Sequence, residues 1–69
     1  MEEIYDEKVS ATYIGLKPPT MRKRRREGKG PSYIKIGRLV RYRQRDLDAF
    51  LEEHLQKPEA KKEPNAQEK

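Results

Sequence analysis

The apolar residues of this 69-residue chain fall into short groups separated by glycine, proline and charge. The clearest group has the i, i+3, i+4, i+8 spacing of a single helical stripe: Leu47, Phe50, Leu51 and Leu55. Asp46 and Asp48 lie near its start, where acids favour the helix dipole. The pattern therefore predicts a helix over residues 46–55 that closes the core and turns an acidic face to solvent.

Two more helices are predicted earlier in the chain, joined by a tight turn. Asp6 can cap the N-terminus of a helix over residues 7–14, and Gly15 can take the left-handed conformation that ends helices. Pro18 then restarts a helix, because the missing N–H of proline has no intrahelical partner in the first turn. This second helix, about Pro18 to Glu27, is stopped by a run of helix breakers: Gly28-Lys29-Gly30-Pro31.

Residues 33–43 contain two β-branched and aromatic runs around a glycine, which indicates a hairpin. A two-residue loop at Gly37-Arg38 would pair Ile36 with Leu39. One more residue in the turn would instead gather the larger apolar side chains on one face: Ile34, Ile36, Val40 and Tyr42. We predict this second register because it buries more apolar surface. It turns three cations outward: Lys35, Arg41 and Arg43.

The elements together predict one small α+β domain that is mainly α: a winged helix-turn-helix with a two-stranded wing and a C-terminal closing helix. The domain is expected over residues 4–55, after an N-terminal extension of residues 1–3. Residues 56–69 have mixed charge and prolines, so they cannot bury enough surface to offset the entropy of ordering. We predict a disordered tail, which is either a solvated end or a tether or partner-binding arm.

The composition excludes several kinds of site. The chain has no cysteine and a single histidine, His54, so we expect no disulfide, no zinc site and no cofactor. A catalytic pocket with a general acid is not expected from this inventory. No apolar run reaches membrane-spanning length and the N-terminus is acidic, which argues against a signal or transit peptide. We expect a cytoplasmic protein that is not an enzyme and does not contact a membrane.

The distribution of charge says more than the formal net charge of +5. From Lys17 to Arg45 there are twelve Lys or Arg residues and one acid, Glu27. The remaining acids of the predicted domain precede or follow this segment, so a basic face and an acidic face are expected. Such asymmetry is typical of a nucleic-acid-binding protein.

The second predicted helix offers the main candidate binding surface. If Met21 marks its buried side, 100° per residue turns Arg22, Lys23 and Arg26 outward. There they could reach phosphates and base edges in a major groove. A solvated cationic helix face is the alternative, but the turn before it and the basic hairpin after it favour DNA. The predicted contact set on this helix is Pro19, Thr20, Arg22, Lys23 and Arg26.

Arg24 and Arg25 are predicted to flank Met21 instead. Either their aliphatic stems cover Phe50 or Leu51 while the charged ends reach Asp46, Asp48 or water, or the helix is loosely held until DNA is present. We favour the packing of the stems.

The hairpin is the second candidate surface. Arg38 at its tip could enter a narrow minor groove, although charges on an edge hairpin can also serve to prevent aggregation. Tyr33 could stack on a base or sugar, although tyrosine on a strand is more often a packing residue. The predicted contact set here is Tyr33, Lys35, Arg38, Arg41 and Arg43.

An ordered series of segments resembles the excisionase family of MerR-like winged helix-turn-helix domains, which includes AlpA-type regulators. The segments are Ala11 to Leu16, Pro18-Pro19-Thr20-Met21-Arg22, Arg26-Glu27-Gly28, Tyr33 to Arg38, Val40-Arg41-Tyr42 and Asp46 to Leu51. Members often carry Ser or Thr at the start of the recognition helix, where this chain has Lys17 followed by two prolines. Many carry a large apolar residue where this chain has Arg24.

The resemblance implies that the helix near Pro18 to Arg26 docks in the major groove and that the hairpin is the wing. It also implies double-stranded DNA as the partner, DNA bending, an integrase and cooperative self-association on DNA. Relatives act as small transcriptional regulators with the same surface, which leaves excision and regulation as alternatives. A single-stranded nucleic-acid binder using Tyr33 and a protein adaptor using the acidic helix are further alternatives.

Overall fold

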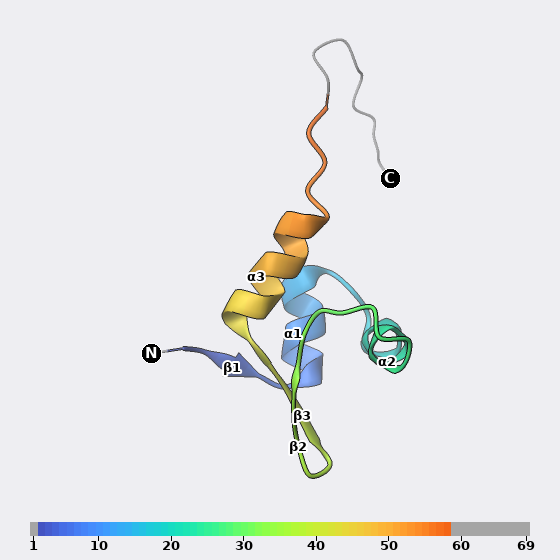
Figure 1. Cartoon of the computed structure of the whole chain (residues 1–69), viewed down its shortest axis with the longest axis vertical. Coiled ribbons are helices and arrows are strands. Elements are labelled where there is room, and N and C mark those ends of the chain that lie inside the picture. Colours follow the sequence, from blue (N-terminus) through green and yellow to red (C-terminus); the bar gives the residue numbers. More distant parts are fainter. Residues whose placement is uncertain (1, 59–69) are drawn as a thin grey trace.

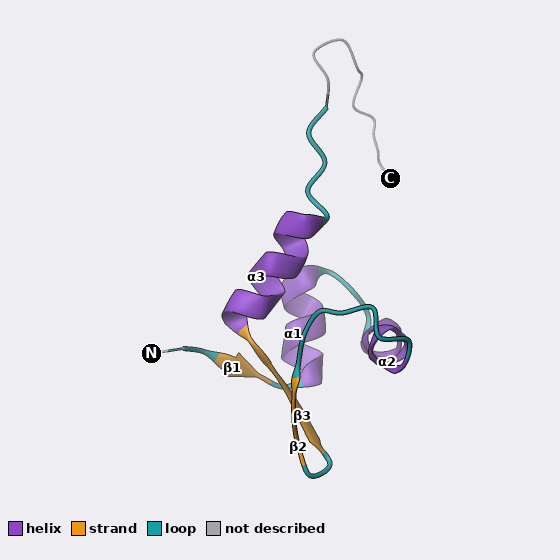
Figure 2. Ribbon diagram, in the orientation of Figure 1, coloured by secondary structure: helices purple, strands orange, loops and turns teal. Residues whose placement is uncertain are grey.

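The computed structural model describes residues 2–58 as three helices and a three-stranded antiparallel sheet (Figure 1). In chain order the elements are β1 (Ile4–Tyr5), α1 (Glu7–Ile14), α2 (Pro18–Arg26), β2 (Ile34–Ile36), β3 (Leu39–Arg43) and α3 (Gln44–Glu53). Figure 2 shows the β2–β3 hairpin projecting away from the three helices. The mainly helical, winged helix-turn-helix fold predicted from the sequence is confirmed.

The tail predicted for residues 56–69 falls mostly outside the described residues. Residues 56–58 have no regular secondary structure. No helix within residues 2–58 combines the length and the apolar character needed to cross a membrane.

The N-terminal segment forms a third strand that the sequence pattern did not predict. Ile4 lies opposite Arg43 and Tyr5 opposite Tyr42, so β3 is the central strand. The carbonyl oxygen of Glu3 also accepts a hydrogen bond from the backbone N–H of Gln44 at 2.9 Å. Two residues cannot show the alternation that identifies a strand, so only pairing with β3 defines this one.

Both ends of α1 follow from its flanking residues, as predicted. The Asp6 side chain accepts a hydrogen bond from the backbone N–H of Val9 at 2.9 Å. Gly15 has φ +80°, and the N–H of Leu16 returns to the carbonyl of Ala11 at 2.8 Å. The left-handed glycine thus lets the chain turn while the last carbonyls stay paired.

The helix α2 begins without a side-chain cap. Lys17 occupies the capping position and makes no capping hydrogen bond. The two prolines that follow have no N–H to satisfy, and the Lys17 carbonyl accepts from both Thr20 and Met21, at 2.9 and 3.0 Å. Because these first donors are already paired or missing, the helix forms without a capping Ser or Thr.

The other end of α2 is closed by its glycine. Gly28 has φ +70°, and its N–H donates to the carbonyl of Arg25 at 3.1 Å. The N–H of Lys29 donates to the carbonyl of Arg24 at 2.8 Å. This pair of bonds is the Schellman arrangement, and it ends the helix at Arg26, one residue before the predicted end.

The hairpin register predicted from burial is wrong. The loop has two residues, Gly37 and Arg38, and the observed pairs are Ile34 with Arg41, Lys35 with Val40 and Ile36 with Leu39. Ile36 and Leu39 are 61% and 53% exposed, so the hairpin tip extends past the core and burial cannot select its register. The turn decides instead: Gly37 has φ +61° and Arg38 has a negative φ, as in a type II′ turn.

The observed register also changes which cations share a face. Directly opposed residues of an antiparallel pair lie on the same face. Lys35 therefore shares a face with Val40 and the buried Tyr42, which is the face packed on the helices. Arg41 and Arg43 lie on the other face, so the predicted common outward orientation of all three is wrong.

The helix α3 starts and ends two residues before the predicted range. It covers Gln44–Glu53, and only part of its apolar stripe is buried. Leu47 and Phe50 join the core with Ala11, Ile14, Met21 and Tyr42. Leu51 and Leu55 are exposed, contrary to the prediction. Figure 1 shows the last turn of α3 extending past the end of α1. Leu51 belongs to this turn, and Leu55 follows the helix.

Candidate nucleic-acid interface

The exposed side of α2 carries two cations with no partner in the domain. Met21, only 1% exposed, fixes the buried side of the helix. Lys23 and Arg26 are exposed, as helical spacing predicts, and neither forms an ion pair with another residue in the range 2–58. Pro19 and Thr20 are also exposed at the start of the helix.

Arg24 serves the packing of α2. Its guanidinium lies 5.0 Å from the centre of the Phe50 ring, so it covers the core in place of an apolar side chain. Its Nε donates to the carbonyl of Gly30 at 2.9 Å and its Nη2 to the carbonyl of Lys29 at 3.0 Å. Arg24 therefore lies over Phe50 as predicted, but with its guanidinium and not its aliphatic stem, and the charged end binds loop carbonyls and not Asp46 or Asp48.

Arg25 connects α2 with α1 and with the base of the wing. Its Nη1 donates to Glu7 Oε1 and to the hydroxyl of Tyr42, both at 3.0 Å. Burial by itself lowers the pKa of Arg25, but the hydrogen bonds to Tyr42 and Glu7 outweigh it and leave the pKa raised. Its guanidinium also lies 5.8 Å from the centre of the Tyr33 ring. Arg25 is therefore a charged link within the domain.

Arg22 is turned toward solvent, but it is not free. Its Nη1 donates to Glu7 Oε2 at 2.6 Å, and its side chain is 51% exposed. Glu7 is a residue of this region that sequence reasoning missed. It lies 15 positions from Arg22 and 18 from Arg25 in the chain, and no local pattern signals a contact over that separation.

The wing residues fall into two groups. Arg38 at the tip, Lys35 and Tyr33 are exposed. Arg41 is partly buried and its Nη1 donates to the carbonyl of Val40 at 2.8 Å. Arg43 is bound to Asp46 at the start of α3, with Nε and Oδ2 2.6 Å apart. The hydrogen bond to Asp46 raises the pKa of Arg43.

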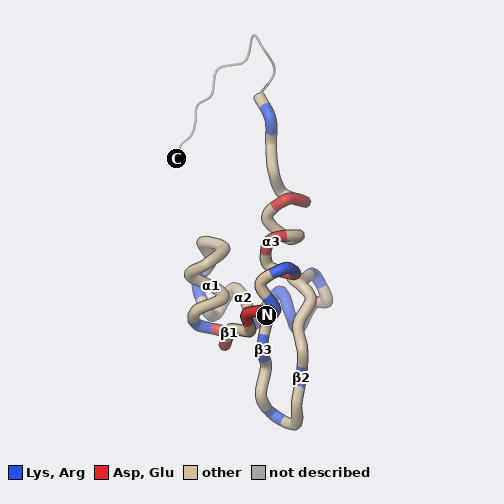
Figure 3. Tube along the Cα trace, turned by 90° about the vertical axis from the view of Figure 1, so that its left-hand side faces the viewer, with Lys and Arg blue, Asp and Glu red and all other residues tan. Residues whose placement is uncertain are grey.

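The basic and acidic residues do not separate into two faces. Figure 3 shows Lys and Arg on α2 and along the hairpin, with acids at the start of α1 and along α3. Glu2, Glu7 and Asp46 each form an ion pair with an arginine. Among the described residues of α2 and the wing, the exposed cations without an ion pair are Lys23, Arg26, Lys35 and Arg38.

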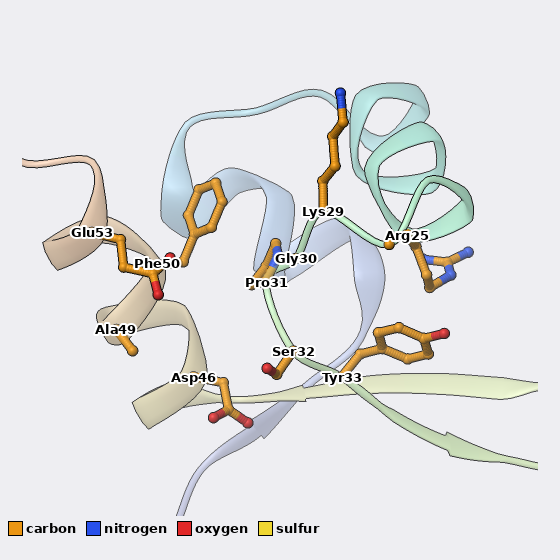
Figure 4. A pocket seen from close by; sticks show the side chains of 11 residues that line it. Arg25, Lys29, Gly30, Pro31, Ser32, Tyr33, Asp46, Ala49, Phe50 and Glu53 are labelled. Atoms are coloured by element: carbon orange, nitrogen blue, oxygen red, sulfur yellow. The ribbon is translucent and has the colours of Figure 1, made fainter.

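A groove lies between the loop after α2, the base of the wing and α3 (Figure 4). Arg25 and Tyr33 line one end, and Asp46 and Glu53 lie on the α3 side. Asp46 and Glu53 would repel the phosphates of a nucleic acid, so the groove does not extend the cationic surface. Within residues 2–58 no group of His, Cys, Asp or Glu side chains is arranged to hold a metal ion.

Comparison with known proteins agrees with this geometry. A family model described as a helix-turn-helix domain matches residues 5–55. This range contains all three helices and the whole wing. No curated protein and no solved structure matches the chain.

Proposed function

Because the chain belongs to the helix-turn-helix domain family, we propose that it binds double-stranded DNA with α2 in the major groove and the wing on the adjacent minor groove. The family makes it a DNA-binding helix-turn-helix protein. The observation that carries the orientation is the exposure of Lys23 and Arg26, opposite buried Met21 and without ion partners in the described domain. Exposed, unpaired cations on one side of a helix are available to phosphates and base edges.

The start of α2 determines how phosphates would be held. Many helices offer backbone N–H groups to a phosphate at their N-terminus. Here Pro18 and Pro19 have none, and the N–H groups of Thr20 and Met21 are bonded to Lys17. The contacts with phosphates must therefore come from side chains: Thr20, Lys23 and Arg26 on the helix, and Lys17, which sequence reasoning did not include and which is exposed beside them.

The wing would add a second anchor. Arg38 stands at the tip of a hairpin that projects from the helices (Figure 2), where a guanidinium can enter a narrow minor groove. Lys35 and Tyr33 contribute from the face turned to α2, and Arg41 from the other face. Arg43 would have to leave Asp46 to contact DNA, so it is the weakest member of the proposed set.

Excision is our first choice of biological role. In this proposal the protein bends DNA, associates with further copies of itself along the site and assists an integrase. Transcriptional regulation through the same surface is the second candidate. We place excision first because of the sequence resemblance. Since both roles use the exposed side of α2 and the wing, the DNA context of the binding site must separate them.

The test is a nuclease footprint on duplex DNA flanking the gene of this protein. We expect protection of a discrete site, and competition by duplex to exceed competition by single strands. Charge reversal in Lys23→Glu/Arg26→Glu should abolish protection. Lys57→Glu should not, because Lys57 follows α3 and the segment after α3 runs away from α2 (Figure 1). Preferred binding of single strands, or protection that survives the double reversal, would overturn the proposal.

A second assay separates the two roles. Purified integrase and supercoiled DNA carrying the attachment sites are incubated with and without the protein. Excision that requires the protein and fails with the double reversal supports the excisionase role. A footprint over a promoter, with excision independent of the protein, supports regulation.

A further inference from the structure

One carboxylate of α1 is inserted among the cations of α2. Glu7 binds Arg22 through Oε2 at 2.6 Å and Arg25 through Oε1 at 3.0 Å. Its side chain is only 21% exposed, whereas that of Arg22 is 51% exposed. Each oxygen of Glu7 therefore has its own guanidinium, and one of these two guanidinium groups faces solvent beside Lys23.

The Glu7 carboxylate is held from behind. Glu7 lies in the first turn of α1, where an acid is favoured by the helix dipole. Arg25, its second partner, is fixed by the hydroxyl of the buried Tyr42 at 3.0 Å and by the ring of Tyr33. The base of the wing thus holds Arg25, Arg25 holds Glu7, and Glu7 holds Arg22. Lys23 and Arg26 have no such support within the described residues.

This arrangement has three consequences for a DNA-facing arginine. A guanidinium has five N–H donors, and the bond to Glu7 uses one at Nη1, so donors remain for the two acceptors of guanine, O6 and N7. The neighbouring carboxylate also repels phosphates. Holding the side chain in place reduces the rotamer freedom lost on binding. Arg22 is therefore poorly suited to contact phosphates in general. It is better suited to a directed contact with one base.

We propose that Glu7 is a positioning residue that directs Arg22 to a base, so that Glu7 determines sequence specificity while it weakens binding to DNA in general. The proposal rests on the double-stranded DNA binding proposed above. A purely structural role, in which Glu7 only joins α1 to α2, is the competing interpretation.

The experiment begins with duplexes that the wild-type protein enriches from a randomised pool. The measured quantity is the specificity ratio, defined as the Kd for a scrambled duplex divided by the Kd for the enriched duplex. We expect Glu7→Gln to lower this ratio about tenfold, within the range that one arginine–guanine pair contributes, with tighter binding to the scrambled duplex. The loss should map to one G·C position in single-position variants of the site.

Glu3→Gln is the matched control. It makes the same change in net charge, and Glu3 is exposed and forms no ion pair within residues 2–58. Its specificity ratio should stay within about twofold of wild type, since a general electrostatic effect acts on all sequences alike. An equal fall in the ratio for Glu3→Gln would overturn the proposal.

A double-mutant cycle tests whether Glu7 acts through Arg22. Arg22→Gln alone should lower the ratio as much as Glu7→Gln, and the double variant should lower it no further. Additive losses would overturn the proposal. If Glu7→Gln is not folded at the assay temperature, Glu7→Asp takes its place, because it keeps the charge near Arg25 but is too short to hold both arginines.

The outcomes also separate this inference from the function beneath it. A wild-type protein that enriches no duplex contradicts the proposed function itself. A wild-type protein with a defined site, together with Glu7→Gln that unfolds at lower temperature but keeps the specificity ratio, contradicts only the role of Glu7 and leaves it as a structural link.

Discussion

The salt dependence of binding provides a quantitative test of which cations meet DNA. Five exposed cations without an ion pair among the described residues lie at the N-cap of α2, on α2 and on the wing: Lys17, Lys23, Arg26, Lys35 and Arg38. Each phosphate contact releases about 0.9 counterion, so five contacts give a slope of log K against log salt of about −4.5. Raising the salt concentration from about 50 to about 200 mM should therefore weaken binding about 500-fold.

Neutral substitutions then identify the contacts. Lys23→Gln should change the slope to about −3.6, so that the same rise in salt weakens binding only about 150-fold. Lys23→Gln/Arg26→Gln should give a slope of about −2.7 and a loss of about 40-fold. The Kd is measured by fluorescence anisotropy with one labelled duplex over a series of salt concentrations.

Lys57→Gln is the control for net charge. It removes one positive charge after α3, away from α2 and the wing (Figure 1), so its slope should match that of wild type. The reasoning is refuted if Lys23→Gln and Arg26→Gln keep the wild-type slope, or if Lys57→Gln reduces the slope as much as they do. Circular dichroism of each variant establishes that the fold is intact.

Three further predictions concern the fold that carries this surface. Met21→Ala should lower the free energy of unfolding in urea by about 2–5 kcal/mol, because Met21 is 1% exposed; Met21→Leu should cost less than about 1.5 kcal/mol, and equal losses would show that the site is not packed. Gly37→Ala should lower the free energy of unfolding by about 1–2 kcal/mol, because φ is +61° there and an L residue is strained in that conformation. The cost is strain alone, since a Cβ there would meet no atom within 4 Å. An unchanged unfolding midpoint would contradict the turn geometry. The hydrogen bond to the Asp48 carboxylate raises the pKa of Tyr13 above 10.0, so the stabilisation is present below pH 10.0 and is lost as the pH rises through the folded-state pKa; in an NMR titration Asp48→Ala should return the Tyr13 pKa toward 10.0, and a pKa that does not move would exclude that bond.

Segments with a local cause could be predicted from the sequence. The capping side chain of Asp6 and the left-handed Gly15 define α1 whatever surrounds it. The prolines after Lys17 and the left-handed Gly28 define α2 within one residue. Helical spacing from Met21 then distinguishes the exposed Lys23 and Arg26 from the packed Arg24. In these segments the deciding interactions join residues a few positions apart.

Other features depend on residues far apart in the chain. The two-residue strand β1 exists only because β3 is beside it. The register of the hairpin was mispredicted because its tip lies outside the core, where the burial used for the prediction has no effect. Leu51 and Leu55 belong to the predicted stripe, but both are exposed among the described residues.

The sequence by itself determined three helices, a hairpin and a cationic helix face, because capping, turn and spacing preferences act locally. Only the tertiary structure decided which of those cations remain available. Arg22 and Arg25 are bound by Glu7, which folding brings from 15 and 18 positions away. Ion pairing depends on distance in space, and a charge run in a sequence carries no information about that distance.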